Sequence, residues 1–434
     1  MKKYALSDIG HLLSALKWLL TYDDMLELQV DDSYVYVPRH FNVKGLGKPL
    51  NAPPIWSGNK LPPLPIKFPP RKHQVRAIQK LLEKQEGILN LACGKGKTYC
   101  ALNLFSHLAV PTAVVVDKSN LIYQWQNAIE EHIDRDVDVG IVKSNKWKYK
   151  NKDITIISIG TLVSRHKNNK IPEGFFDSFG LVIFDECHHL AANSLRKIAP
   201  LFPYKRLGLS ATPKREDGNE EVFFNHLGPI IYSDLKQDLI PEVSFHTLPT
   251  SPELPVSTRA VNGEINHRRL CSYLGSIDER NNYIFILIDQ LLQEKHKVLC
   301  LTHSVDHVEL LKNILPSKVK AKTSFVTGST LPQERNYLIE EADVSVATID
   351  IAAEALDVPR LSAVIVLTPF GARQEGNTLF QVLGRIQRTA KNKTHPVAIF
   401  LEDENIGMCK NLMHQIRRRL YDARIDFTRN GIVY

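Results

Sequence analysis

The feature that most limits what this chain can fold into is the octapeptide LACGKGKT at residues 91–98. Residues 88–91 form a short apolar run typical of a strand, and Gly96 precedes what we expect to be a helix. Glycines let the backbone curl, so that successive N–H groups converge at the positive end of the helix dipole. The pattern therefore predicts an anion-binding loop between a strand and a helix. A glycine-rich turn without a ligand is the alternative.

The loop suits a triphosphate such as ATP. Lys97 would reach the β- and γ-phosphates, and the Thr98 hydroxyl would ligate Mg²⁺. The strict form of this motif has glycine where Leu91 stands, so the motif alone is only moderately specific. The residues expected to form the phosphate cradle are Cys93, Gly94, Lys95, Gly96, Lys97 and Thr98.

Length and composition favour a folded protein of two or three domains. The chain has 434 residues, of which 43% are hydrophobic and 24% charged, so large apolar cores are available. A net charge of +8 makes a polyanionic partner plausible but is weak evidence for one. The six cysteines include no CxxC pair, which indicates neither a zinc site nor a disulfide framework. Because no apolar run approaches membrane-spanning length, we expect a cytoplasmic protein that does not bind membranes.

Prolines and apolar runs divide the chain into four parts. Residues 1–66 are expected to form a small α+β accessory domain with a helix and a β-hairpin, ending in a proline-rich linker. Residues 67–235 and 271–434 each alternate short β-branched runs with helical stretches, the pattern of parallel sheets buried on both faces. Residues 236–270 contain prolines and few apolar patterns, which favours a linker. The predicted strands are 113–116, 154–159, 181–184, 207–209, 298–301, 324–326, 345–347, 364–367 and 398–401.

The fold class predicted from these parts is α/β. Two parallel-sheet domains stand in tandem, preceded by the small N-terminal domain, with a hinge between the two large domains.

Two adjacent carboxylates follow the apolar run 181–184. In a chain that carries a phosphate loop, Asp185 is well placed to hold Mg²⁺, largely through water. Glu186 would orient and deprotonate the water that attacks the γ-phosphate. A solvated acidic strand end is the alternative, and it is less probable for two adjacent carboxylates. His188 and His189 lack the spacing of a zinc site.

Arg385 and Arg388 lie three residues apart on an expected helix and therefore on one face. The planar guanidinium donates to several phosphate oxygens and keeps its charge. From the second domain, these arginines would reach ATP only when the cleft closes, which would make hydrolysis sensitive to domain motion. Taken alone, such a pair is usually a solvated helix face.

In order along the chain, these segments resemble the motifs of superfamily 2 helicases of the DExH type across residues 68–405. Residues 91–98 are similar to motif I as that superfamily writes it, where the first glycine is often absent. Asp185-Glu186-Cys187-His188 resembles motif II, and residues 381–388 resemble motif VI. The resemblance implies two RecA-like domains, ATP-driven movement on nucleic acid, and Mg²⁺ as the cofactor.

The resemblance also implies roles for single residues. Arg71 would stack on adenine and Gln74 would read the edge of the base. Asp357 would touch the ribose, although Ala355 stands where the family usually has glycine. Gln381 would sense His188. Ser210 and Thr212, in the segment similar to motif III, would couple the state of ATP to the nucleic-acid groove. The residues expected to hold the phosphate backbone of a strand, without reading its sequence, are Gln124, Thr161, Thr302 and Thr348.

The branch of the superfamily is indicated by fewer residues. Gln124-Trp125 looks like the DNA-translocating branch, and Arg215-Glu216-Asp217 is similar to a short element of XPB-like DNA helicases. The overall layout resembles phage fork-remodelling and branch-migration helicases of the UvsW type. We therefore expect a DNA helicase in replication, recombination or repair, in the host cytoplasm if a phage encodes it.

The expected partners are single-stranded and branched duplex DNA, with replication or recombination proteins as possible further ones. The alternatives are an RNA helicase, a duplex translocase that does not separate strands, and a nucleic-acid-binding module whose ATPase serves only as a switch.

Overall fold

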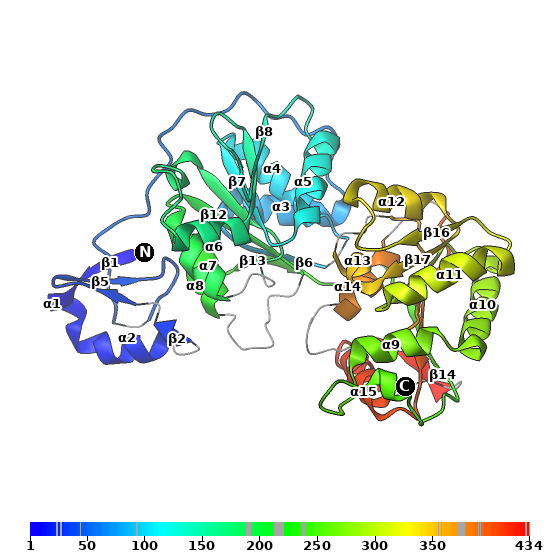
Figure 1. The fold of residues 1–434 in the computed structure, drawn as a ribbon. Helices are drawn as coiled ribbons and strands as arrows, with labels where there is room; N and C mark the ends of the chain where they lie inside the picture. The colour runs from blue at the N-terminus through cyan, green and yellow to red at the C-terminus, as the bar shows by residue number, and fades with distance from the viewer. Residues whose placement is uncertain are drawn as a thin grey trace. The chain divides into compact units, whose positions relative to one another are not determined.

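The computed structural model describes residues 1–434 except 23, 24, 27, 44, 93, 188–191, 212–220, 237, 238, 355, 357, 371–377, 389, 391, 430, 431 and 434. The chain divides into two compact units, Met1–Leu235 and Lys236–Tyr434, which Figure 1 colours from blue through green to red. Each unit is built on one eight-stranded sheet, and the first also carries a small sheet of its own near the N-terminus.

The N-terminal part is a small α+β domain with its own apolar core, as predicted. Its sheet has the order β1-β5-β4 with antiparallel pairing, and the expected hairpin is formed by β4 and β5. Its elements are β1 (Lys2–Ala5), α1 (Leu6–Ile9), α2 (Leu13–Leu19), β2 (Thr21–Tyr22), β3 (Met25–Leu26), β4 (Gln29–Val30) and β5 (Tyr34–Val37). Leu16, Leu20 and Val35 lie at the centre of its core. Arg39 joins it to the larger sheet by donating to the carbonyl oxygens of Pro203 and Tyr204.

The large sheet of the first unit has the order β13-β6-β12-β11-β7-β10-β8-β9. All neighbouring strands are parallel except β8 and β9. Its strands are β6 (Gly87–Leu91), β7 (Thr112–Val116), β8 (Val139–Lys143), β9 (Lys146–Lys148), β10 (Ile154–Ser158), β11 (Leu181–Phe184), β12 (Lys205–Ser210) and β13 (Ile230–Asp234). Its helices are α3 (Lys72–Lys84), α4 (Lys97–Leu108), α5 (Ser119–His132), α6 (Ile159–Lys167), α7 (Ala192–Ile198) and α8 (Glu221–Leu227).

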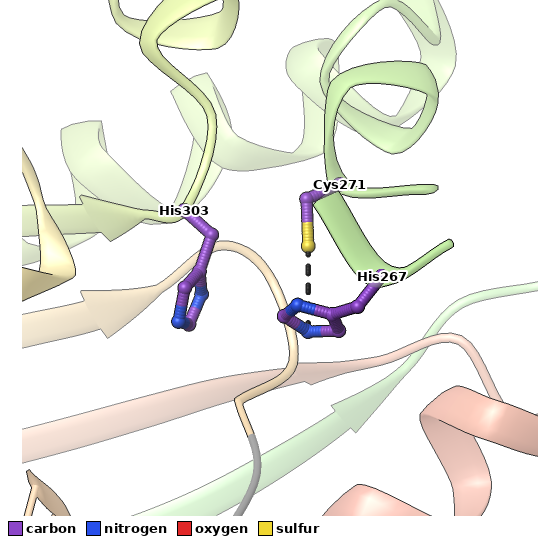
Figure 2. Close-up of side chains that lie close together, drawn as sticks. All are labelled: His267, Cys271 and His303. Atoms are coloured by element: carbon purple, nitrogen blue, oxygen red, sulfur yellow. Dashed lines mark hydrogen bonds between the residues drawn. The ribbon is translucent and has the colours of Figure 1, made fainter. Parts of the chain in front are cut away.

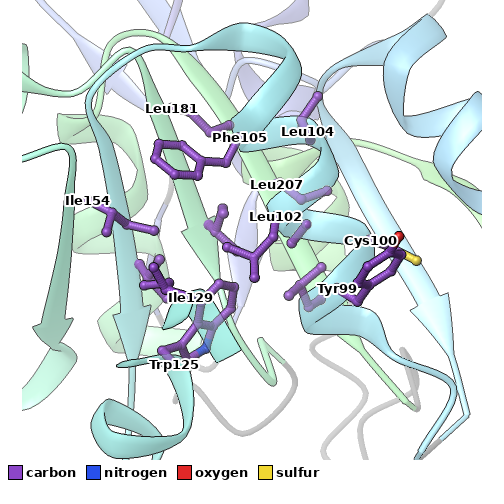
Figure 3. Packing of buried hydrophobic residues seen from close by; sticks show 14 of the residues in the cluster. Tyr99, Cys100, Leu102, Leu104, Phe105, Trp125, Ile129, Ile154, Leu181 and Leu207 are labelled. Atoms are coloured by element: carbon purple, nitrogen blue, oxygen red, sulfur yellow. The ribbon is translucent and has the colours of Figure 1, made fainter. Parts of the chain in front are cut away.

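Helices cover both faces of this sheet. Ile183 packs with Leu102 and Phe105 of α4, while its neighbour Phe184 packs in a second cluster with Leu195 of α7. Consecutive strand residues point to opposite faces, so a strand buried on both sides must be apolar throughout. Figure 3 shows the first of these cores, where α4 and α5 meet the strands.

The sheet of the second unit has the order β16-β17-β15-β18-β19-β14-β20-β21. Only β20 and β21 pair antiparallel. Its strands are β14 (Glu242–Thr247), β15 (Val298–Thr302), β16 (Thr323–Val326), β17 (Val344–Thr348), β18 (Ala363–Val366), β19 (Val397–Glu402), β20 (Phe427–Arg429) and β21 (Ile432–Val433). Its helices are α9 (His267–Gly275), α10 (Asp278–Gln293), α11 (Val305–Lys318), α12 (Pro332–Glu341), α13 (Ile349–Glu354), α14 (Thr378–Ile386) and α15 (Gly407–Asp422).

The predicted α/β class, with two parallel-sheet domains in tandem after a small N-terminal domain, is confirmed. Each of the nine predicted strands is present, with ends that differ by at most two residues. Residues 236–270, which we expected to form a linker, contain β14, which lies between β19 and β20 inside the second sheet. Among the described residues, none of the helices has the length and apolarity needed to cross a membrane.

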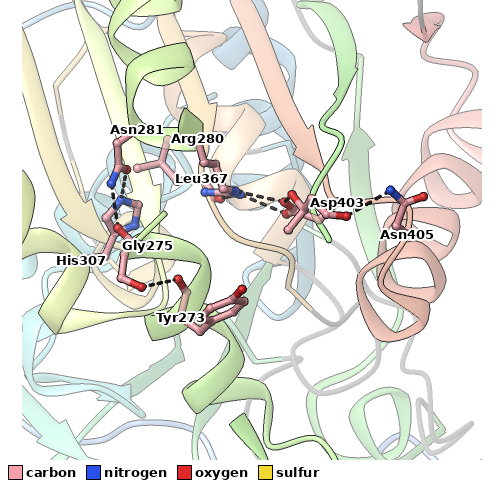
Figure 4. A network of polar contacts seen from close by, with 10 residues as sticks. Tyr273, Gly275, Arg280, Asn281, His307, Leu367, Asp403 and Asn405 are labelled. Atoms are coloured by element: carbon pink, nitrogen blue, oxygen red, sulfur yellow. Dashed lines mark hydrogen bonds and ion pairs between the residues drawn. The ribbon is translucent and has the colours of Figure 1, made fainter. Parts of the chain in front are cut away.

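A buried ion pair anchors α10 to the end of β19 in the second unit. Arg280 Nε lies 3.1 Å from Asp403 Oδ1, and both side chains are almost fully buried. Asp403 also accepts a hydrogen bond from the Thr250 hydroxyl at 2.6 Å, and Arg280 donates to the carbonyl oxygen of Leu367. Figure 4 shows this network beside the contact between Asn281 and His307. A charge buried in this way stays favourable only while its partner is present.

Candidate nucleotide site and nucleic-acid interface

The phosphate loop has the backbone that the glycines predict. Gly94 and Gly96 have φ values of +82° and +77°, in the left-handed region, and Lys97 is the first residue of α4. A Cβ atom at Gly96 would overlap the side-chain amide of Gln74. The loop therefore needs glycine at position 96 for both its dihedral angle and its space.

Gln74 ties the start of α3 to this loop. Its Oε1 accepts the Arg71 N–H at 2.9 Å, and its Nε2 donates to the carbonyl oxygen of Lys95 at 3.2 Å. The side chain is 4% exposed, whereas Arg71 is exposed. Both ends of the Gln74 amide thus have partners within the protein, so reading a base would require it to exchange one of them.

The two lysines of the loop point to different carboxylates. Lys95 Nζ lies 2.8 Å from Asp234 Oδ2, at the end of β13. Lys97 Nζ lies 3.2 Å from Glu186 Oε1, just past the end of β11. Thr98, the next residue of α4, is half-buried. The structure thus brings Lys97 together with the predicted acidic pair, whereas Lys95 pairs with Asp234 at the sheet edge.

Asp185 is held in a setting that controls its protonation. Burial and the neighbouring charge of Glu186 raise the pKa of its carboxyl to about 6, while hydrogen bonding from Trp125 and the charge of Lys97 lower it. The Glu186 N–H donates to Asp185 Oδ1 at 3.0 Å. Glu186 itself has a φ of +42°, which is uncommon for a residue with a side chain and is typical of functional sites.

Trp125 entered the sequence analysis only through its resemblance to the DNA-translocating branch, and its contact with the acidic pair was not predicted. Its indole Nε1–H donates to Asp185 Oδ2 at 2.8 Å, and the side chain is 1% exposed among the core residues seen in Figure 3. A buried tryptophan usually finds an acceptor for its N–H, which is the one signal that could have predicted a polar partner. Its neighbour Gln124, which we expected to touch nucleic acid, is half-buried on the same helix.

A basic groove surrounds Thr161 at the start of α6. Its volume is about 520 Å³, and it is lined by Lys143, Ser144, Asn145, Ser158, Gly160, Thr161, Ser164, Arg165, Asn168 and Lys170. The Thr161 hydroxyl accepts the Ser144 N–H at 2.9 Å, and Arg165 donates to the Ser144 carbonyl oxygen at 3.1 Å. These described lining residues include three cations and no carboxylate. Cations interspersed with hydroxyls suit phosphate oxygens.

In the second unit, Thr302 and Thr348 stand at the ends of two adjacent strands, β15 and β17. Thr302 is fully buried, and its hydroxyl contacts the Ser304 N–H at 3.2 Å and His307 Nδ1 at 3.3 Å. This burial speaks against the direct strand contact that we expected of Thr302. Thr348 is 8% exposed, so little of it can be reached from solvent as well.

The two predicted arginines of the second unit do not share a helix. Arg385 lies in α14 and donates to the Leu356 carbonyl oxygen at 2.9 Å. Arg388 lies two residues beyond the end of that helix, so the expectation of one helical face was wrong. Gln381 is half-buried on α14. The helix ends at Ile386, before Arg388.

Several predicted residues lie outside the part of the chain that the structure describes. They are Cys93, His188, Thr212, Ala355, Asp357 and the segment 215–217. Ser210, which was expected to couple the two sites, ends β12 and is fully buried. Its position next to β6 and β11 in the sheet puts it between the phosphate loop and the acidic pair.

The donors present fit a Mg²⁺–nucleotide complex. Hard oxygen donors such as the Thr98 hydroxyl and the Asp185 carboxylate are the ligands that Mg²⁺ prefers. The start of α4, with glycines that leave its N–H groups uncovered, fits phosphate oxygens. Lys97 adds a positive charge beside both.

Comparison with known families divides the chain in the same way. Residues 67–215 match the family described as type III restriction enzyme, res subunit, and residues 283–390 match the helicase conserved C-terminal domain. The first match covers most of the sheet that carries the phosphate loop. The second covers β15 to α14 of the second sheet.

Two curated relatives illustrate the range of similar proteins. The DNA 3'-5' translocase XPB2 of Sulfurisphaera tokodaii is 37% identical over 171 residues, which cover 39% of this chain and 36% of that protein. A putative ATP-dependent RNA helicase of Acanthamoeba polyphaga mimivirus is 25% identical over 385 residues, covering 86% of this chain and 71% of that protein. The chain thus spans about a third of the first relative and about two thirds of the second.

Solved structures share the fold. Saccharomyces cerevisiae Dbp5 bound to RNA and ADP BeF3 superposes with a TM-score of 0.56 at 16% identity, covering 83% of this chain and 89% of that one. T4 UvsW covers 87% of this chain and 79% of that one at 16% identity, with a TM-score of 0.35 that is too low for the likeness to carry an argument.

Proposed function

The chain belongs to the superfamily 2 helicases, and from this premise we propose that it is an ATP-dependent DNA helicase or translocase that remodels branched DNA. The observation that carries the proposal is the cluster in which Lys97 lies 3.2 Å from Glu186, with Asp185 beside it. These side chains come from the phosphate loop and from the end of β11, where a nucleotide and its metal are bound on a parallel sheet.

Each residue of the cluster has a distinct task in the proposed hydrolysis. Lys97 and the loop N–H groups hold the β- and γ-phosphates, and Thr98 and Asp185 would hold Mg²⁺. An ion held there would supply positive charge to the γ-phosphate during the reaction. Glu186 orients the attacking water and accepts its proton. Its ion pair with Lys97 would have to open when the phosphates take up the lysine.

Further residues complete the proposed nucleotide site. Arg71, which is exposed just before α3, would stack on adenine. The ribose contact of Asp357 stays a prediction. Arg385 and Arg388 of the second unit would supply positive charge to the phosphates during hydrolysis. A Lys97→Ala protein should bind ATP weakly and lose hydrolysis. Normal turnover by that protein would refute the assignment of the phosphate loop.

The groove around Thr161 supports binding of a nucleic-acid strand by its backbone. Lys143, Arg165 and Lys170 offer positive charge, and the described residues that line the groove include no carboxylate. Contacts of this kind position a strand but carry no sequence information, so binding should be independent of sequence and sensitive to salt. Gln124, half-buried on α5, is a further candidate for such a contact.

DNA is the favoured substrate because one relative, 37% identical over 171 residues, is named a DNA translocase. That name also supports a second candidate, movement on duplex DNA without strand separation. An RNA substrate is the third, because the mimivirus relative is named a putative RNA helicase. Residues 1–66, a separate small domain, are the part that we propose to sense a fork or junction.

The experiment that separates these candidates is ATP-dependent strand release from four labelled substrates. They are a tailed DNA duplex, a replication fork, a four-way junction and an RNA duplex, each tested with wild-type protein and with Glu186→Gln. Preference for the fork and junction would support branch remodelling in replication, recombination or repair. Release of only the RNA duplex would refute the DNA assignment. ATP turnover with displacement of a bound blocker, but no strand release, would favour the duplex translocase.

A further inference from the structure

Three side chains of the second unit that the proposed ATPase does not use converge on one point. His267 and Cys271 stand four residues apart on α9 and therefore share a face of that helix. His303 follows β15, in the short segment before α11. One ligand atom from each of the three lies within 4.8 Å of the other two. Figure 2 shows the thiol and the two imidazoles turned toward a common space.

The separation of two of these atoms matches a tetrahedral metal site. Cys271 Sγ lies 3.6 Å from His267 Nε2. Zinc binds thiolate at about 2.3 Å and imidazole at about 2.0–2.1 Å, so at a tetrahedral angle the two ligand atoms stand about 3.6 Å apart. The third ligand atom, at up to 4.8 Å, has to move nearer by roughly 1 Å to meet the same geometry. His303 is half-buried, and its Nδ1 lies 3.5 Å from the Thr368 hydroxyl, a contact that the ring would give up in turning toward the ion.

We propose that His267, Cys271 and His303 bind a zinc ion, with water in the fourth position. Two imidazoles and one thiolate are borderline-soft donors, which zinc prefers over the oxygen sites that suit Mg²⁺. The two half-buried histidines leave a path for the ion, while the buried thiol is shielded on the protein side. This site belongs to the second unit, whereas the phosphate loop belongs to the first.

Zinc binding requires that the Cys271 thiol lose its proton and that the proton of the His267 ring move to its other nitrogen. Burial raises the pKa of the Cys271 thiol to about 12, so the metal displaces one proton from sulfur and that proton leaves to solvent. His267 Nε2 lies 2.8 Å from the Pro369 carbonyl oxygen, to which it can donate. To bind through Nε2, the neutral ring carries its proton on Nδ1 instead. The loss of the contact to Pro369 opposes binding.

Existing contacts already hold the two ligand-bearing segments together. The Ser272 hydroxyl, next to Cys271 on α9, lies 2.9 Å from the Ser304 hydroxyl and 3.0 Å from Asp306 Oδ2. The imidazoles of His267 and His303 are 5.0 Å apart between ring centroids. Because these contacts hold the segments that carry the donors, the ion has to reorient only the side chains of His267 and His303. The zinc would lock α9 to the segment that follows β15.

Cobalt titration of the full chain tests this site directly. Chelator-treated protein is titrated with Co²⁺, whose d–d bands report tetrahedral geometry and whose thiolate-to-metal charge-transfer band reports a cysteine ligand. The matched pair of variants is Cys271→Ala and Cys300→Ala, which each remove a buried thiol from the second unit. Wild type and Cys300→Ala should bind one Co²⁺ with the charge-transfer band, and added Zn²⁺ should abolish the band. Cys271→Ala should lack it.

Thermal unfolding gives an independent readout. Zinc at about one hundred times its dissociation constant should raise the midpoint of the second unit by roughly 5–10 °C in wild type. The rise should be lost in Cys271→Ala and kept in Cys300→Ala.

If Cys271→Ala does not fold, His267→Gln decides, because it should keep the thiol but weaken metal binding at least tenfold. An unchanged charge-transfer band in Cys271→Ala, or no such band in wild type, would overturn the proposal. Equal zinc affinity in wild type and His267→Gln would overturn it as well.

Discussion

Replacing Trp125 by phenylalanine tests how the chain controls its metal-binding carboxylate. The change removes the N–H that donates to Asp185 Oδ2 at 2.8 Å and keeps an aromatic ring in the core. This hydrogen bond stabilises the ionised carboxylate and so lowers its pKa. Without it, the pKa of Asp185 should rise above its value of about 6.

The size of the effect follows from the strength of such bonds. A hydrogen bond to a charged group contributes roughly 1.5–3 kcal/mol, and one pKa unit corresponds to about 1.4 kcal/mol, so the pKa should rise by about one to two units. A carboxyl with a pKa of about 6 is roughly 90% ionised at pH 7. After the substitution, roughly 10–50% should be ionised. Since Mg²⁺ binds the ionised form, ATP turnover at limiting Mg²⁺ should fall by about two- to tenfold at pH 7.

The assay is the pH profile of DNA-stimulated ATP turnover at limiting Mg²⁺. In Trp125→Phe, the acidic limb should move to higher pH by one to two units, and turnover should recover at high pH. Trp56→Phe is the matched control, because among the described residues the Trp56 N–H has no hydrogen-bond partner. An unmoved acidic limb in Trp125→Phe, or an equal shift in Trp56→Phe, would refute the reasoning.

Three further substitutions have expected outcomes. The pKa of Asp185 is higher in the folded protein than in the unfolded chain, so ionisation of this carboxyl lowers the stability of the fold as pH rises from about 4 to about 6. Asp185→Asn removes this charge. Without metal at pH 7, its free energy of unfolding in chemical denaturation should therefore be higher than that of wild type by up to about 3 kcal/mol. Lys170→Ala should weaken DNA binding equally for all sequences and reduce the slope of log affinity against log salt by about one, whereas exposed Lys60→Ala should not. Arg280→Met should destabilise the second unit by about 3–5 kcal/mol in urea unfolding, because Asp403 would stay buried without its partner; a change below 1 kcal/mol would contradict this.

Most of the strands that the sequence predicted are buried on both faces; the exception is β16 at the edge of the second sheet, whose burial alternates. Runs such as 181–184 are apolar at every position, because helices pack on both faces of the sheet there. β8 and β14 were not predicted, because Gly140 interrupts the apolar run of β8 and polar residues interrupt that of β14. β14 also lies in a proline-bearing stretch, and only its pairing with β19 and β20 makes it a strand.

The parts of the candidate site that could be predicted are those formed by residues adjacent to one another in the sequence. The phosphate loop and the acidic pair are short motifs, and the structure brings Lys97 and Glu186 together as expected. The contact between Trp125 and Asp185 joins residues sixty positions apart, so no local pattern contains it. The proposed zinc site was not predicted for the same reason, because His303 is remote in sequence from His267 and Cys271 of α9.

The burial of Thr302 shows that a motif residue can have a role inside the domain. Its motif suggested a strand contact, but its hydroxyl is used inside the domain by Ser304 and His307. A motif identifies which residues matter without saying whether their side chains face a ligand or a neighbour.

The measurement that most directly tests the central claim is ATP turnover by the full chain with and without single-stranded DNA, in wild type and in Glu186→Gln. We predict that DNA accelerates turnover in wild type. In Glu186→Gln, turnover should fall by at least about a hundredfold while ATP still binds, because general-base catalysis typically contributes about 10²–10⁴-fold. Turnover that is indifferent to DNA, or that survives the substitution, would contradict the account.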